Sequence, residues 1–136
     1  MTKIVRFYDI ESNCFHDIKT VFDSGASLDL ISEKIANEKN LKIKNGVKTE
    51  LCGAFGGNTC VLGDVDLAID IDNTRKIIRF GVVNTSVFEV IIGNPSLSVL
   101  KLKIQENNVF TLENRVLGQY KITEHNQIES CNKLEF

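Results

Sequence analysis

Residues 20–27, TVFDSGAS, contain the strongest candidate for chemistry in the chain. Val21 and Phe22 are apolar and lead directly into Asp23, and small residues follow the acid. A carboxylate at the end of a core strand is partly buried, so its pKa can be tuned for acid–base work. Gly25 lets another backbone approach closely. The stretch fits a carboxylate that cleaves peptides, although Asp-Ser-Gly alone is also a common surface turn.

Two later stretches favour the catalytic interpretation over the turn. Residues 51–63, LCGAFGGNTCVLG, surround Phe55 with glycines. They fit a mobile β-hairpin lid whose backbone can hydrogen-bond an extended peptide, and an irregular glycine-rich hairpin is the alternative. Residues 90–97, VIIGNPSL, carry a run of large aliphatic residues that ends on Gly93. The alternative here is a buried strand and a turn, with Pro95 opening a helix.

The elements that must position these residues are mostly strands. Alternating or continuous apolar runs predict them at 3–10, 15–22, 47–51, 61–71, 76–83, 87–92, 100–104 and 109–112. A polar turn at 11–13 should join the first two strands, and a hairpin turn at 105–108 should join the last two. One short helix is expected at 32–38, with Ser32 as its N-cap. This pattern predicts an all-β domain with a closed or folded-over architecture and one short helix.

Composition limits the classes of function. The chain has 136 residues, of which 43% are hydrophobic and 25% charged, as expected for one ordinary globular domain. A net charge of −2 provides no basic footprint for nucleic acid or an anionic membrane. No apolar run approaches the roughly 18 residues that would span a bilayer, and the first residues lack a signal-peptide core. A cytoplasmic protein is therefore expected.

Residues that commonly bind metals are not arranged as ligand sets. The cysteines form no CxxC motif, and His16 and His125 lie far from any cluster, so zinc is not expected. Four aspartates alternate along one predicted strand and its end, at positions 64, 66, 70 and 72. A solvated acidic face explains this period-two pattern without a calcium ion. Neither a metal nor an organic cofactor is expected.

The four cysteines are Cys14, Cys52, Cys60 and Cys131. Free thiols in a reducing compartment are the expected state. Cys52 and Cys60 flank the tip of the predicted lid, but the aligned register places them diagonally. A disulfide between them would need strain or a different turn.

Together, these stretches resemble the retroviral-type aspartic proteases, the retropepsins. That family shows two hydrophobic residues and Asp-Thr/Ser-Gly-Ala, then a glycine-rich flap, then Ile/Leu-Ile-Gly ahead of a short helix. VFDSGAS, CGAFGG and VIIGNPSL follow this order, and the resemblance covers about residues 3–112. RFGVV followed by VFEVIIG resembles the late strands of retrotransposon proteases. An LTR-retrotransposon or domesticated retroelement protease is therefore the nearest type.

The resemblance implies a role for each matching residue. Asp23 would be the catalytic aspartate, and Ser24 would brace the paired active-site loops across a dimer. Gly25 would offer its carbonyl to substrate, while Ala26 and Ser27 would line the cleft. The flap would comprise Gly53, Ala54, Phe55, Gly56 and Gly57. The residues that pack beside the loop would be Ile91, Ile92 and Gly93, with Ile91 the better candidate for a subsite wall.

The chemistry of this family needs two carboxylates that share one proton. The chain has one Asp-Ser-Gly, so a symmetric homodimer would supply the second Asp23. The implied function is an aspartic endopeptidase that processes a retroelement polyprotein in the cytoplasm or a retroelement particle. The alternatives are a retropepsin-like peptide-binding or dimerisation module with weak or lost catalysis, and a monomeric β-barrel that binds a ligand.

The sequence departs from the family in two places. Retroviral enzymes pair an acid two residues after the motif glycine with an arginine after Ile-Ile-Gly, but Ser27 and Asn94 occupy these positions and cannot form an ion pair. The chain also continues well past residue 104, so the dimer interface is expected to use C-terminal strands, including the 100–112 hairpin. The protease domain is expected at 1–118, with 119–136 as an extension that is partly disordered or left by cloning.

Overall fold

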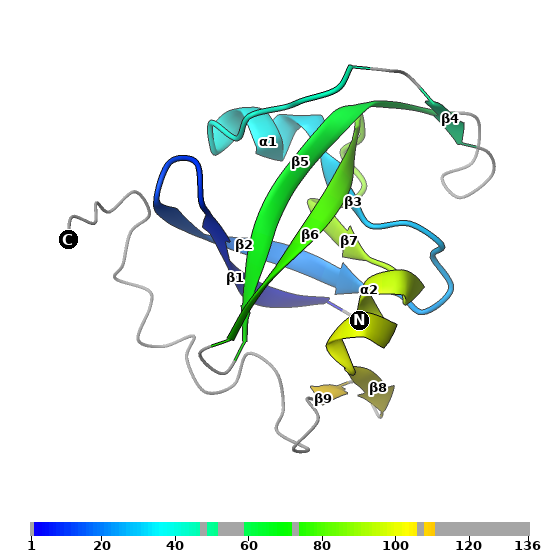
Figure 1. Cartoon of the computed structure of the whole chain (residues 1–136). Coiled ribbons are helices and arrows are strands. Elements are labelled where there is room, and N and C mark those ends of the chain that lie inside the picture. The colour runs from blue at the N-terminus through cyan, green and yellow to red at the C-terminus, as the bar shows by residue number, and fades with distance from the viewer. Residues whose placement is uncertain (1, 47–48, 52–58, 72–73, 106–107, 111–136) are drawn as a thin grey trace.

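The computed structural model describes residues 2–46, 49–51, 59–71, 74–105 and 108–110 (Figure 1). The strands are β1 (Thr2–Asp9), β2 (Cys14–Phe22), β3 (Leu30–Ser32), β4 (Thr49–Leu51), β5 (Thr59–Ile71), β6 (Thr74–Val83), β7 (Val90–Ile92), β8 (Lys103–Gln105) and β9 (Asn108–Phe110). The helices are α1 (Glu33–Glu38) and α2 (Asn94–Leu100). The expected boundary at 118/119 and the expected extension lie outside the described residues.

The main sheet closes on itself. Its strands follow the order β1-β2-β7-β3-β6-β5-β4, and a further pairing between β1 and β5 completes a ring that leaves β4 outside. Short β7 pairs in parallel with β2 and antiparallel with β3. Figure 1 shows β2 and β7 ending beside α2. The prediction of a closed all-β architecture is confirmed.

Buried residues alternate with more exposed ones along the strands, and the buried ones form the core. In β2, every second residue is buried, from Cys14 to Phe22, and β5 buries Val65, Leu67 and Ile69. The rings of Phe7 and Phe80 meet edge to face, with centroids 5.8 Å apart. Period-two patterning therefore identified the inward faces of these strands correctly.

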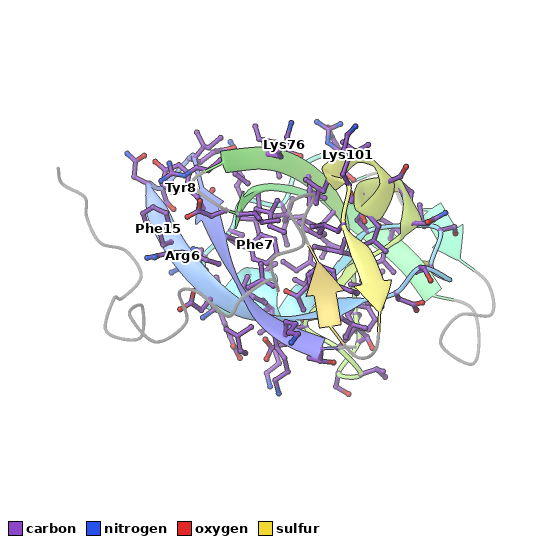
Figure 2. All side chains as sticks on the ribbon, turned by 90° about the horizontal axis from the view of Figure 1, so that it is seen from below. Arg6, Phe7, Tyr8, Phe15, Lys76 and Lys101 are labelled. Carbon is purple, nitrogen blue, oxygen red and sulfur yellow. The ribbon has the colours of Figure 1, made fainter. Side chains whose placement is uncertain are left out.

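Phe7 and its neighbours show the two faces of β1 (Figure 2). Phe7 points into the barrel, whereas Arg6 and Tyr8 lie on the outer face near Phe15. The Arg6 guanidinium lies 4.3 Å from the centroid of the Phe15 ring, and Arg75 lies 4.3 Å from the Tyr8 ring. These stacked cations shield aromatic surface that would otherwise face water.

The short helix α1 begins at the predicted residue. The hydroxyl of Ser32 accepts a hydrogen bond from the backbone N–H of Ile35 at 3.1 Å, which satisfies a donor that the first turn leaves unpaired. Ile35 and Ala36 face the core. The second helix, α2, begins next to Pro95, as in the strand-and-helix interpretation of VIIGNPSL.

Two of the expected strands have different bounds in the structure, and one cysteine differs in its bonding state. The strand expected at 87–92 is confined to β7, because Val87 donates its N–H to the hydroxyl of Thr85 in a turn. Leu100 ends α2 instead of starting a strand, and the predicted hairpin is the pair β8–β9. Cys60 is a free, exposed cysteine, but the expectation of a free thiol is wrong for Cys14, which is disulfide-bonded.

The acidic face of β5 is paired with cations instead of being only solvated. Asp66 lies 3.1 Å from the guanidinium of Arg79 and 3.7 Å from the ammonium of Lys44, and Lys44 also contacts Glu11 at 2.9 Å. These bonds, above all the one from Arg79, hold the pKa of the Asp66 carboxyl below its usual value. Within the described ranges, no three His, Cys, Asp or Glu side chains gather as metal ligands.

Candidate active site

The Asp23 loop leaves the barrel at the end of a fully paired strand. Phe22 is buried and lies opposite Ile92 in the parallel ladder between β2 and β7. The backbone N–H of Asp23 continues this ladder by donating to the carbonyl of Ile92 at 3.0 Å. The Asp23 side chain is exposed in the single chain, where partial burial was expected. The barrel therefore fixes the backbone of Asp23 while its carboxylate faces outward.

The turn after Asp23 orients the carboxylate. Its Oδ1 accepts a hydrogen bond from the N–H of Gly25 at 2.9 Å, and its backbone carbonyl accepts from Ala26 at 3.1 Å. A Cβ on Gly25 would stand 3.3 Å from Asp23 Oδ1, which is tighter than ordinary van der Waals contact. Oδ2 has no hydrogen-bond partner in the described part of the chain. One carboxylate oxygen is thus held by the loop and the other is available to a reactant.

The remaining loop residues lie beside Asp23. Ser24 and Ser27 are exposed, and Ala26 is half-buried. Ser27 and Leu28 line a cavity of about 360 Å³ that reaches Val61 on β5 and Gly81 on β6. This cavity adjoins the loop and does not include Asp23 in its lining. It is a place where a chain bound across the loop could insert a side chain.

The Ile-Ile-Gly segment, residues 91–93, packs against the Asp23 loop. Ile92 is fully buried in the main core, whereas Ile91 belongs to a smaller cluster with Leu30 that also packs against Ala26. A Cβ on Gly93 would stand 2.5 Å from the carbonyl oxygen of Leu28 and 2.7 Å from that of Ala26. Only glycine fits this contact. The structure therefore brings residues 23–27 and 91–93 together.

The segment expected to form the flap lies outside the described residues: Gly53, Ala54, Phe55, Gly56 and Gly57. The strands on either side of it are described, and β4 pairs antiparallel with the start of β5, with Leu51 opposite Thr59. The role of the flap residues stays a prediction.

Asp29 is a residue of the site that the sequence did not identify. Its Oδ1 accepts a hydrogen bond from the N–H of Gly93 at 2.8 Å, and its Oδ2 accepts from the hydroxyl of Ser96 at 2.6 Å. Asn94 donates its own N–H to the carbonyl of Ala26 at 2.8 Å. The only sequence signal was an acid shortly after the loop and a serine shortly after Gly93, and such a pair is too common to be informative.

Comparison with solved structures places this architecture among known folds. The retroviral protease-like domain of Ddi1 from Leishmania major aligns with a TM-score of 0.58 at 15% identity, over 85% of this chain and 91% of that one. The fold is retropepsin-like. The EIAV protease in complex with the inhibitor HBY-793 aligns with a TM-score of 0.54 at 21% identity, over 77% of this chain and 91% of that one. No family model and no curated protein matches the sequence.

Among the helices of this retropepsin-like domain that the structure describes, none is both long and apolar enough to cross a membrane.

Proposed function

We propose that the protein is an aspartic endopeptidase that acts as a homodimer. One observation carries this proposal: in a retropepsin-like barrel, an Asp-Ser-Gly turn at the end of a buried strand presents the exposed carboxylate of Asp23. The turn holds Oδ1 through the N–H of Gly25, and Oδ2 has no hydrogen-bond partner among the described residues. A peptide-cleaving acid needs this combination of a rigid backbone and an accessible oxygen.

The chemistry follows from two Asp23 side chains that share one proton. Like charges about 3 Å apart cannot both ionise, so one carboxyl group stays protonated. The ionised carboxylate takes a proton from water as the water oxygen bonds to the scissile carbonyl carbon, and the other carboxyl group gives its proton to the carbonyl oxygen. When the C–N bond breaks, the carboxyl group that took the proton from water gives it to the leaving nitrogen. The other carboxylate takes a proton from a hydroxyl of the tetrahedral intermediate, so both groups return to their starting state.

The exposure of the loop in the single chain supports a dimer. Asp23, Ser24 and Gly25 are all exposed, and the side chain of nearby Leu28 is 42% exposed although it is large and apolar. A two-fold axis beside the loop would bring two copies of this surface together and would place Asp23 of one subunit next to Asp23 of the other. Interlocking hydrogen bonds from Ser24 would then brace the paired loops. The hairpin of β8 and β9 is the proposed additional contact between the subunits.

The proposed substrates are extended, largely apolar polypeptide segments. From the motif resemblance, the proposed natural substrate is the polyprotein of a retrotransposon or a domesticated retroelement. Cleavage would take place in the cytoplasm or in a retroelement particle. The second candidate function is a peptide-binding or dimerisation module with weak or lost catalysis. The observation that favours it is the pair of neutral residues, Ser27 and Asn94, where retroviral enzymes form an ion pair.

Digestion of a peptide library tests this proposal. The wild-type chain, Asp23→Asn and the matched control Asp17→Asn are compared with and without pepstatin. Asp17 is an exposed acid on β2, the strand that leads into Asp23. We expect the wild type and the control to cleave the same peptides, and Asp23→Asn to lose at least about a thousandfold in rate. Equal cleavage by Asp23→Asn, or none by concentrated wild type, would refute the proposal.

A further inference from the structure

We infer that Asp29 is a positioning residue for Asp23, and that it takes the place of the ion pair that Ser27 and Asn94 cannot form. This inference rests on the proposed function. It is carried by the two hydrogen bonds that the Asp29 carboxylate accepts from the segment that begins α2, one from Gly93 and one from Ser96.

The Asp23 loop is fastened to residues 92–96 at both of its ends. At the first end, the N–H of Asp23 donates to Ile92 at 3.0 Å. At the other end, both oxygens of the Asp29 side chain accept hydrogen bonds, from Gly93 N–H at 2.8 Å and from Ser96 Oγ at 2.6 Å. Between the ends, Asn94 N–H donates to the carbonyl of Ala26 at 2.8 Å. The turn that carries Asp23 is therefore held by hydrogen bonds at both of its ends and in the middle.

Asp29 is itself anchored to the barrel. Its backbone carbonyl accepts a hydrogen bond from the N–H of Gly81 on β6 at 2.9 Å. The next residue, Leu30, starts β3 and lies opposite both Gly81 and Ile91 in the sheet. The carboxylate thus joins a rigid strand to the start of α2. A shift of this side chain would displace the loop against Gly93.

Gly93 has no side chain that could accept a hydrogen bond from the first turn of α2. It is the N-cap residue of α2 and has no side-chain acceptor for the first turn. Because the carbonyl oxygens of Leu28 and Ala26 occupy the space where its Cβ would be, a capping Ser or Asp could not replace it. Asp29 reaches the helix start from the opposite segment and provides a charged acceptor, which forms stronger hydrogen bonds than a neutral one.

The test compares Asp29→Ala, Asp29→Asn and the exposed control Asp17→Ala with the wild-type dimer. In Asp29→Asn the amide oxygen can still accept from Gly93, and the amide nitrogen can donate to the hydroxyl of Ser96, so the brace is kept in shape. We measure kcat and KM per dimer, with the dimer fraction from analytical ultracentrifugation. The exchange rate of the Gly93 amide hydrogen is measured by NMR.

We expect Asp29→Ala to lower kcat by at least about tenfold with KM within about threefold, because misplaced reacting groups slow chemistry more than binding. The Gly93 amide should exchange at least about tenfold faster in the same variant. Asp29→Asn should restore both values to within about threefold of wild type, and Asp17→Ala should change neither. If Asp29→Ala does not fold, Ser96→Ala removes only one of the two bonds and should lower kcat by about threefold.

An unchanged kcat per dimer in Asp29→Ala, or in Ser96→Ala if that variant must replace it, overturns the inference, since a purely structural role would reduce only the fraction of folded dimer. If the wild-type dimer cleaves no peptide, the proposed function fails instead. The exchange of the Gly93 amide then decides by itself whether Asp29 holds the loop.

Discussion

Gly93 packs against the carbonyl oxygen of Leu28, with no room for a side chain between them. An added Cβ would stand 2.5 Å from that oxygen, and both contacting groups are backbone, so the clash cannot be relieved by rotating a side chain. The turn that carries Asp23 therefore rests directly on the backbone that begins α2. The position of the Asp23 loop therefore depends on a glycine that takes no part in the proposed chemistry.

Replacing this glycine should destabilise the whole domain. We expect Gly93→Ala to lower the free energy of unfolding by about 1–3 kcal/mol, the usual cost of overpacking. The matched control is Gly46→Ala, because among the described residues a Cβ there would meet nothing closer than the carbonyl of Leu62 at 3.9 Å. Urea denaturation measures both. Equal stability of the two variants would contradict the close contact.

A shared active site should show itself when wild-type and Asp23→Asn chains are mixed. In an equal mixture with free exchange, only about a quarter of the dimers contain two wild-type chains, so activity per wild-type chain should fall by about half. Mixing with the control Asp17→Asn should leave that activity unchanged. Activity that is proportional to wild-type chains alone would indicate a site complete within one chain.

Dilution should reduce activity per chain. Because each site needs two copies of Asp23, the active fraction depends on protein concentration near the dissociation constant of the dimer. Rates measured over a dilution series should fall faster than linearly with concentration. The fall should coincide with the loss of dimer in sedimentation profiles. A strictly linear series, with monomer present throughout, would argue against the dimeric site.

His16 should make the fold sensitive to mild acid. Its side chain is 4% exposed, and neither ring nitrogen has a hydrogen-bond partner among the residues described. Burial lowers the pKa of His16 below its ordinary value of 6.5, Lys39 lowers it further, and Asp9 and Asp17 oppose the shift. The neutral ring is thus favoured in the folded chain. As pH falls below about 6.5, the unfolded chain binds a proton that the folded chain resists, and stability declines.

The decline should reach at most about 1.4 kcal/mol per pH unit until the folded pKa is passed. The change His16→Leu should flatten the stability curve between pH 6.5 and the lower pKa. Thr20→Val, a buried and non-titrating change on the same strand, should shift stability equally at every pH. Chemical denaturation across this range measures all three proteins. Parallel curves for wild type and His16→Leu would show that His16 does not titrate with unfolding.

Local rules predicted much of the barrel. Alternation placed Val65, Leu67 and Ile69 on the inner face of β5, and a hydroxyl followed by a helical run located the start of α1 at Ser32. These features depend on periodicity and capping, which are properties of neighbouring residues. The proximity of the Asp23 turn to Gly93, in contrast, was implied only by the resemblance to the retropepsins.

The features that were missed depend on contacts between distant residues. Asp29 lies 64 positions from Gly93 and 67 positions from Ser96, and no local pattern connects them. The positions of Ser27 and Asn94, in contrast, are marked by a family pattern. The strand expected at 87–92 is an exception with a local cause, because the hydroxyl of Thr85 accepts a hydrogen bond from the N–H of Val87 and turns the chain.

The position of β7 in the sheet affects when the chain can fold during its synthesis. The three residues of β7 pair with β2 on one side and with β3 on the other. The two strands that flank the Asp23 turn are therefore connected only when a segment about seventy positions downstream of the turn has joined the sheet. Pairings of such large sequence separation form slowly, and they cannot form on a ribosome until that segment has emerged. A growing or truncated chain that lacks residues 90–96 would carry the aspartate without its support, and the proposed hydrolytic activity could begin only after this segment has emerged and paired.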